Sequence, residues 1–430
     1  MGEFCSWARV SVRGAWAAAL VAMSAGASAQ TLLNADGSLS VSGFGTVGAT
    51  HVDAPAGWGF RRESNQAGKT AGWTADVDSR AGVQLNYAPD PRFEWVTQLM
   101  AVPRARFTPD NELLRWAFAA LRPTPQLQFR LGRLSSDLML MSTYRNVGFA
   151  YATVRPPVEV YGLVPSVVDG ADVAQVWPTE QGRWRAALML GQARAGQYDA
   201  GGPLRLRDMG WATLSYETPG LTVRTAWCSG RFSNNPQDAQ PAIDSLNRVA
   251  ALPVPQVASE AATLADALTT SGRHLGYFTL SVRHEAGLWQ VQGEGMRVTG
   301  LPQGRLYGGY LQVGRRLDEV TVFSQVSQVK GTAALALQPQ WQAALSPLIG
   351  APAAAQAQQL ASATATGLAA AGADQRTFSV GAAWAIDPKL MLKAQWDRVH
   401  ATARGAAYWS PRGTQGVQAN VLSLSADFVW

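Results

Sequence analysis

Alternation of apolar and polar residues is the feature that most limits how this chain folds. In the segment WTADVDSRAGVQLNY, residues 73–87, apolar residues occupy nearly every odd position and polar residues the even ones. A period of two places successive side chains on opposite faces of a β-strand, and no helix carries this pattern. The segment ends at the turn sequence APDP, residues 88–91, and a second such segment begins at Phe93. The pattern predicts a β-hairpin.

Similar turn sequences recur along the chain. They are RPTP (122–125), PTEQG (178–182), ETPG (217–220), HEAG (284–287), RLDE (316–319) and DPK (387–389). Each joins two alternating segments, so these turns and the first one pair about fourteen strands. A first strand from Leu39 and a closing strand from Asn420 to Trp430 raise the total to about sixteen. An even number of antiparallel strands places both ends of the sheet on one side.

The connections at the opposite ends of the strands are longer and irregular. The clearest are residues 53–70, 233–272 and 331–375. Short turns at one rim and long connections at the other are typical of bacterial outer-membrane barrels. The sequence therefore predicts an all-β fold, a transmembrane antiparallel β-barrel with short periplasmic turns and long extracellular loops.

The N-terminus indicates export. After two arginines, an apolar run ends in the small-residue sequence ASA, residues 27–29, which is typical of a signal-peptide cleavage site. The run is shorter than the roughly twenty apolar residues of a spanning helix. We expect residues 1–29 to be a signal peptide and residues 30–430 to form the barrel, located in the outer membrane. No later apolar run reaches the length of a spanning helix, so no helical membrane domain is predicted.

Cysteines and charge narrow the possibilities further. Cys5 belongs to the signal peptide and Cys228 is then alone, so the mature chain has no intramolecular disulfide. The net charge of +6 falls to +5 when residues 1–29, with two arginines and one glutamate, are removed. Almost all of the positive charge is arginine.

The two strand faces predict two environments. In KLMLKAQWD, residues 389–397, apolar even positions oppose odd positions that are polar except at Met391, so we expect lipid outside and a polar lumen inside. Aromatic residues lie near the short turns, where they suit a headgroup boundary. On the closing strand, Leu424, Phe428 and Trp430 share the apolar face. This strand must pair with the first, because an unpaired strand edge is unfavourable in lipid.

These features resemble the sixteen-stranded porins of Gram-negative outer membranes. The resemblance rests on SGFGTVGATHVD (42–53) as a first strand, on LQFRLGRLSSDL (127–138) before a long insertion, and on a C-terminal strand that ends in an aromatic residue. It implies a water-filled channel, a possible homotrimer, and recognition of Leu424, Phe428 and Trp430 by the barrel-assembly machinery. Trp430 stands where the family usually has Phe. The acidic Pro-Glu-Phe-Gly-Gly motif of general porins and the lysine ladder of phosphate-selective relatives are absent, so no subfamily is indicated.

The resemblance also implies that the third loop, residues 134–166, folds into the lumen and narrows it. Two prolines within this loop restrict its backbone. The candidate constriction and pore-lining residues are Asp76, Asp78, Arg80, Arg130, Asp137, Arg145, Arg155, Glu159, Arg183, Arg185 and Arg224. Fixed charges in a pore bias which ions enter it.

The predicted function is passive diffusion of small hydrophilic solutes with a mild preference for anions. Outward positions look almost free of charge, so the surplus of +5 is expected on the inner faces and loops. If the carboxylates neutralise these arginines locally, little preference remains. We expect no nucleic-acid partner, because the arginines are dispersed rather than clustered.

Two alternatives stay open. The Ala/Gln-rich segment 351–375 has helix-forming composition, and a barrel plugged by its loops could serve as an adhesin or structural protein. A barrel hydrolase would need a base, and His51 near Asp76 and Asp78 is the least implausible pair. No metal-ligand spacing and no cofactor motif is found, and neither metal nor cofactor is expected.

Overall fold

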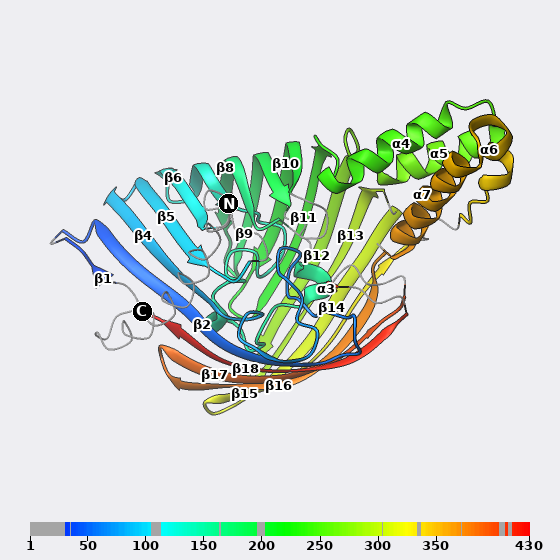
Figure 1. The fold of residues 1–430 in the computed structure, drawn as a ribbon. Helices are drawn as coiled ribbons and strands as arrows, with labels where there is room; N and C mark the ends of the chain where they lie inside the picture. Colours follow the sequence, from blue (N-terminus) through cyan, green and yellow to red (C-terminus); the bar gives the residue numbers. More distant parts are fainter. Residues whose placement is uncertain are drawn as a thin grey trace, which may run out of the picture.

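Sixteen strands close into one antiparallel barrel in the computed structural model of the protein. Each strand pairs with the next along the chain, and β18 pairs with β2 to close the ring (Figure 1). The structure describes residues 31–34, 36–104, 113–162, 165–195, 203–302, 304–332, 337–370, 372–403, 409–411 and 415–430. The predicted fold class is confirmed. The expected signal peptide, residues 1–29, lies outside the described residues.

The barrel strands all run between the same two rims. They are β2 (Leu39–Asp53), β4 (Arg80–Asp90), β5 (Phe93–Ala101), β6 (Leu114–Thr124), β7 (Leu127–Ser135), β8 (Val167–Pro178), β9 (Arg183–Ala195), β10 (Leu204–Glu217), β11 (Leu221–Phe232), β12 (His274–Ala286), β13 (Trp289–Leu301), β14 (Gly304–Leu317), β15 (Val320–Gly331), β16 (Asp374–Asp387), β17 (Leu390–Ala401) and β18 (Val417–Val429). Two short strands, β1 (Thr31–Leu32) and β3 (Gly72–Thr74), also pair with β2.

Every predicted short turn joins two consecutive paired strands, from β4–β5 through β16–β17. Long connections leave the other rim, with one exception. β13 ends at Leu301 and β14 begins at Gly304, so this connection is as short as the turns of the opposite rim. The end with the short turns is called the turn rim below, and the other end the loop rim.

The strand predicted over residues 73–87 is wrong in its first half. The structure has β3, then a turn over residues 75–79, and then β4. The turn is stabilised locally, because Ser79 N donates to Ala75 O at 3.2 Å and Asp76 N donates to Thr74 Oγ1 at 3.1 Å. These bonds replace ladder bonds, so the alternation in this stretch continues across a turn.

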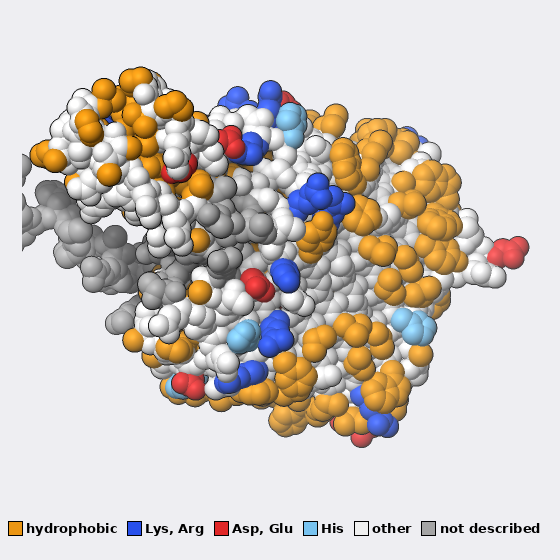
Figure 2. Space-filling view, turned by 90° about the vertical axis from the view of Figure 1, so that its right-hand side faces the viewer, with side chains coloured by type: hydrophobic (Ala, Val, Ile, Leu, Met, Phe, Trp, Pro, Cys, Tyr) orange, Lys and Arg blue, Asp and Glu red, His pale blue; other side chains and the backbone are white. Residues whose placement is uncertain are grey.

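The outer wall is apolar as expected, with exposed outward side chains such as Leu131 at 67% and Leu190 at 72%. The expected polar inner face is found only in part, because inward side chains such as Met189 and Met296 are apolar and buried in a cluster with residues of the connection between β7 and β8. Exposed aromatic side chains near the turn rim include Tyr87, Trp177, Trp184, Trp289 and Trp384. Figure 2 shows hydrophobic side chains over much of one side of the wall. A wall of this kind suits contact with lipid acyl chains.

The expectation of an outer wall almost free of charge is wrong near the loop rim. There the outward positions carry several cations, among them Lys330, Arg376 and Arg398, which are exposed. The strands are longer than the apolar band, so their ends extend beyond it into a polar environment.

Two of the long connections form a helical arm beyond the barrel. The arm consists of α4 (Gln240–Ala250) and α5 (Pro255–Leu268) between β11 and β12, and of α6 (Gln342–Ile349) and α7 (Ala351–Ala370) between β15 and β16. These helices bury a separate apolar cluster that includes Leu246, Leu264 and Trp341, and they project from the loop rim (Figure 1). The helix expected in segment 351–375 is α7. None of the helices in the described part of the chain is long and apolar enough to cross a membrane.

Candidate functional site: the loop-filled lumen

The described residues of the connection between β7 and β8, 136–162 and 165–166, cross the lumen as predicted; we call this segment the inner loop. It contains one turn of 3-10 helix (Gly148–Ala150) and the short helix α3 (Val158–Tyr161). Its backbone meets the inner face of the wall, where Lys393 Nζ donates to Gly148 O at 2.6 Å and to Thr153 O at 3.0 Å. The same ammonium group lies 3.0 Å from Asp427 Oδ2. The loop is therefore held by charged groups of β17 and β18.

Arg155 anchors the inner loop at its centre. Its guanidinium group donates to Asp78 at 2.9 and 2.7 Å and to Asp397 Oδ2 at 2.6 Å, and it also bonds Ser423. All three charged side chains are buried. Burial alone would raise the pKa of Asp78, but the positive charge and hydrogen bonds of Arg155 lower it to about 2. Arg155 thus joins the β2–β4 connection, the inner loop and β17.

Two glutamates fix the remainder of the inner loop through neutral donors. Glu159 on α3 accepts hydrogen bonds from Ser327 at 2.9 Å, from Gln375 at 2.6 Å and from Thr377. Glu294 on β13 accepts from the backbone N–H of Leu140 at 2.9 Å. These contacts tie the loop to the wall over β13–β16.

Glu294 has further neutral donors. Ser281 Oγ donates at 2.8 Å, Tyr310 OH donates at 2.9 Å, and the Tyr161 hydroxyl bonds the same carboxylate. Burial, followed by the negative charge of Glu294, raises the pKa of Tyr161 well above its usual range, so this hydroxyl stays protonated and keeps donating. The alternation on β13 places Glu294 on the inner face, but nothing in the sequence says that the inner loop reaches it.

Three predicted wall arginines hold carboxylates. Asp137 of the inner loop lies 3.0 Å from Arg185 Nη1, and it also pairs with Arg224, whose Nη2 donates to Asp137 O at 2.6 Å. Burial alone would raise the pKa of Asp137, but these arginines lower it. Arg130 forms a bidentate pair with Asp172 on the adjacent strand β8. Arg130, Arg185 and Arg224 lie on the inner face and remain half-buried.

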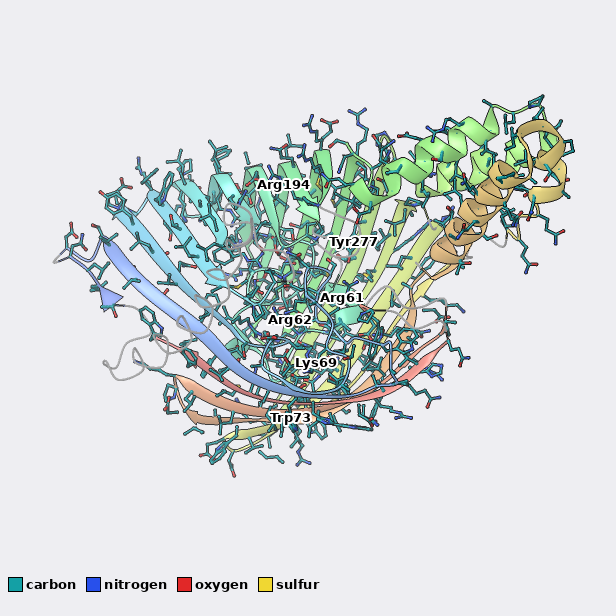
Figure 3. All side chains as sticks on the ribbon, in the orientation of Figure 1. Arg61, Arg62, Lys69, Trp73, Arg194 and Tyr277 are labelled. Atoms are coloured by element: carbon teal, nitrogen blue, oxygen red, sulfur yellow. The ribbon has the colours of Figure 1, made fainter. Side chains whose placement is uncertain are left out.

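Other arginines in the lumen contact neutral groups. Arg80 is fully buried and donates to Asn146 O at 2.6 Å, to Asp78 O at 2.9 Å and to Tyr151 OH at 2.9 Å. Arg62, from the β2–β4 connection, lies among the side chains that fill the lumen (Figure 3). Within the described residues its Nη1 has no hydrogen-bond partner, and its nearest ion-pair partner, Glu63, is 3.9 Å away. Sequence reasoning missed Arg62 because it follows no strand pattern.

Burial and then the positive charge of Arg80 lower the pKa of Arg62 to about 10, and burial together with Arg115 does the same for Arg145. Both pKa values stay far above neutral pH, so both groups remain charged. Positive charge is therefore concentrated where the β2–β4 connection meets the inner loop.

Two predicted site residues lie outside this assembly. Asp76 is exposed in the turn before β4, and none of the hydrogen bonds or ion pairs among the described residues joins its side chain to the inner loop. Arg183 is 61% exposed and pairs with Glu217 at 2.7 Å at the turn rim. The remaining nine predicted residues lie on or around the inner loop, as described above.

The closing seam shows why the chain ends in aromatic residues. Trp430 exchanges both backbone hydrogen bonds with Gly43, at 2.8 and 2.9 Å. A Cβ atom at Gly43 would lie 2.1 Å from the Trp430 ring, and one at Gly45 would lie 2.2 Å from the Phe428 ring. The two rings therefore lie directly over glycines of β2, whereas Leu424 is exposed on the outer wall.

The structure separates His51 from Asp78, one of the two carboxylates considered as its partner in a hydrolase. The ring of His51 packs against Trp73, with centroids 5.2 Å apart. Asp78 faces the lumen, where it accepts a hydrogen bond from Thr50 at 2.6 Å. Adjacent strand residues point to opposite faces, so His51 and Asp78 lie on opposite sides of the wall. Among these residues no group of three or more His, Cys, Asp and Glu side chains could hold a metal ion.

Comparison with solved structures gives the same architecture at low sequence identity. OmpT of Vibrio cholerae aligns with a TM-score of 0.50 and 12% identity, over 93% of this chain and 100% of that chain. An anion-selective porin from Comamonas acidovorans aligns with a TM-score of 0.50 and 10% identity, over 91% of this chain and 100% of that one. OmpF of Salmonella typhi, in complex with daunomycin, aligns with a TM-score of 0.50 and 10% identity, over 91% of this chain and 97% of that chain.

No protein-family profile matches the sequence, and no curated protein sequence matches it. The likeness to solved structures therefore concerns architecture alone. The protein has the fold of the sixteen-stranded barrels of bacterial outer membranes.

Proposed function

We propose that this protein is an outer-membrane porin that allows small hydrophilic solutes to diffuse through its lumen, with a mild preference for anions. The closed barrel, its apolar outer wall and its partly polar inner face support a channel. The inner loop supplies the constriction. Export by the N-terminal signal, insertion by the barrel-assembly machinery and assembly as a homotrimer belong to the same proposal.

One observation carries the anion preference: the carboxylates around the inner loop are buried, whereas four of the arginines there keep part of their surface exposed. The buried carboxylates around the inner loop are Asp78, Asp137, Glu159, Asp172, Glu294, Asp397 and Asp427. The half-buried arginines are Arg130, Arg145, Arg185 and Arg224. A buried carboxylate is shielded from permeating ions by its partners, whereas a partly exposed guanidinium group can meet them. Asp137 and Asp172 do neutralise arginines locally, so the proposal is that the partly exposed arginines beside the inner loop still leave a positive field there.

The field of the constriction adds to this asymmetry. Arg62 and Arg80 contact neutral groups or a distant carboxylate, as described above. Arg145 donates to Tyr161 O at 3.5 Å and remains half-buried. At physiological salt the Debye length is about 8 Å, comparable to the half-width of a narrowed porin lumen, so these charges act across the opening.

Replacing Arg145 with Gln tests the proposal. A unit charge about 10 Å from a permeating ion changes its energy by about 0.4 kcal/mol in water, with opposite signs for anions and cations. The anion-to-cation permeability ratio should fall by up to about fourfold at low salt, and by less at 0.15 M. The measurement is the zero-current potential of a bilayer-inserted channel under a salt gradient.

Arg183→Gln is the matched control, because Arg183 is an exposed arginine at the turn rim, away from the inner loop. It should leave the potential nearly unchanged. Cation preference in the wild type, or an Arg145→Gln variant with the wild-type potential, would contradict the anion preference. A barrel with no conductance steps would instead favour the plugged adhesin or structural protein, for which the filled lumen is the supporting observation.

A further inference from the structure

A groove on the outer wall near the loop rim combines apolar and cationic linings. Its volume is about 910 Å³. The apolar part is formed by Tyr307, Leu311, Val326 and Phe378. The polar part is formed by Gln328, Lys330, Arg376, Arg398, His400 and Gln418. Such a division matches a ligand with a hydrocarbon portion and an anionic head.

Two glycines of β14, Gly308 and Gly309, line this groove. Gly309 faces outward and pairs with Gly295 of β13. A Cβ atom added at Gly295 would meet nothing within 4 Å. A paired glycine leaves the wall locally bare between larger outward side chains. This depression has the shape that an acyl chain requires.

The cations of the groove lack carboxylate partners within the described part of the chain. The side chains of Lys330 and Arg376 make no hydrogen bond or ion pair among these residues. Arg398 donates to the neutral amides of Asn420 at 3.1 Å and Gln418 at 2.8 Å. One carboxylate, Asp374, stands opposite Lys330 across the strand pair. The cluster therefore has excess positive charge.

Its height on the wall matches a lipid headgroup. Trp384, at the turn rim, and Arg376 lie on the same outward face of β16, eight residues apart. At about 3.3 Å per residue and a tilt of about 40°, this separation spans roughly 20 Å across the membrane. The apolar band of such barrels is about 25 Å tall, so the cations lie near its outer boundary. In Figure 2, Lys and Arg side chains lie between the hydrophobic part of the wall and the helical arm.

The neighbouring arm is compatible with an anionic surface. Between Lys330 and Asp374 the chain contains no Asp, Glu, Lys or Arg. This stretch includes α6 and α7, which begin and end next to the groove strands β15 and β16. This uncharged part of the arm does not repel negatively charged headgroups.

We propose that this groove binds a phosphate-bearing lipid of the outer leaflet. The phosphate lies among Lys330, Arg376 and Arg398, and one acyl chain lies over Gly308 and Gly309 against Phe378 and Val326. Arginine suits phosphate because its planar guanidinium group can form two parallel hydrogen bonds to it. The proposal rests on the outer-membrane location but not on conduction, so a failed conductance test leaves it standing.

Native mass spectrometry of the folded, delipidated full-length barrel in neutral detergent tests the site. The probes are bis-phosphorylated lipid A, its dephosphorylated analogue and inorganic phosphate. The triple variant K330Q/R376Q/R398Q should bind the phosphorylated lipid about 100-fold more weakly, since each cation near an anionic headgroup contributes about 1 kcal/mol and 1.4 kcal/mol is a factor of ten. Arg315→Gln, an exposed outward arginine near the turn rim, is the matched control and should change binding less than twofold.

Three results would overturn the proposal: equal affinity of wild type and triple variant, equal affinity for the dephosphorylated lipid, or displacement of the lipid by inorganic phosphate at equal concentration. The last would indicate a site for free phosphate. If the triple variant does not fold, Arg376→Gln alone should weaken lipid binding about fivefold. Wild-type affinity of this single variant would likewise overturn the proposal. Cross-linking that places a second copy of the chain over Phe378 in the lipid-bound protein would also contradict a lipid site.

Discussion

Replacing Arg155 with Gln should release the inner loop from the wall. In the wild type one guanidinium group serves two carboxylates, at 2.7 Å from Asp78 and 2.6 Å from Asp397. All three side chains are buried. A glutamine cannot neutralise either acid, so the variant leaves two carboxylates buried without a cation.

The expected loss follows from what each carboxylate retains. Removing one member of a buried ion pair costs about 3–5 kcal/mol. Asp78 keeps a hydrogen bond from Thr50 at 2.6 Å, and Asp397 keeps one from Gln395 at 2.7 Å. These bonds offset part of the loss, so we expect a decrease of about 3 kcal/mol in the free energy of unfolding.

Two measurements on the refolded protein check this prediction. Urea unfolding in lipid vesicles, followed by tryptophan fluorescence, gives the change in stability. Single-channel recording gives the state of the constriction, where a released inner loop should produce fluctuating conductance. The control is the triple variant Asp78→Asn, Arg155→Gln, Asp397→Asn, which removes all three charges and should regain most of the lost stability.

The reasoning would be refuted if Arg155→Gln lost less than about 1 kcal/mol and conducted as steadily as the wild type. That result would mean that the neutral contacts of Glu159 and Glu294 suffice to hold the loop. A triple variant as unstable as the single one would locate the loss in packing rather than in charge.

Three further results are expected. The Phe428 ring covers Gly45 at the seam, so Gly45→Val should lower the free energy of unfolding of the barrel by about 1–3 kcal/mol, and deletion of residues 428–430 should abolish assembly. Heat-modifiable migration of membrane fractions measures how much barrel is folded in both variants. Wild-type levels of the folded truncated barrel would contradict the seam argument. The Arg155 anchor should persist in acid, because the pKa of Asp78 is lowered to about 2. The contribution of the Asp78–Arg155 pair to the stability of the fold should be complete above about pH 4 and should be lost as the pH falls through about 2. Measuring unfolding as a function of pH in acid tests this window. N-terminal sequencing of the outer-membrane protein should begin at Gln30, and an uncleaved chain would contradict the predicted signal peptide.

The barrel was predictable because its signals are local. A period of two and a turn sequence can each be recognised within about a dozen residues, and together they locate every hairpin of the turn rim. They miss the short connection between β13 and β14 at the loop rim. The same reasoning failed at residues 75–79, where Thr74 and Ser79 stabilise a turn inside an apparently continuous alternation. Alternation reports which face a side chain would occupy, not whether the backbone remains in the ladder.

The lumen was predictable only in part, because its contacts join distant segments. The charges of the inner loop can be named from sequence, yet their partners cannot: Arg155 meets Asp397, which lies 242 positions along the chain. Glu294 and Lys393 are visible as inward polar residues on their strands, but many such residues exist. Which of them the loop touches depends on the path of the loop across the barrel, and no local pattern encodes that path.

The structure separates two uses of charge in the lumen, and this separation constrains how selectivity can change. Carboxylates around the inner loop are buried because they hold it in place, through Arg155 and Lys393 or through neutral donors such as Tyr310. Removing one of them alters the shape of the opening before it alters the field. Among the half-buried arginines, Arg130, Arg185 and Arg224 hold the buried acids Asp172 and Asp137. Arg145 donates to the backbone carbonyl of Tyr161 and keeps part of its surface exposed. We therefore expect replacement of Arg145 to change ion preference, whereas substitutions at the buried carboxylates, or at the arginines that hold them, should first change conductance and stability.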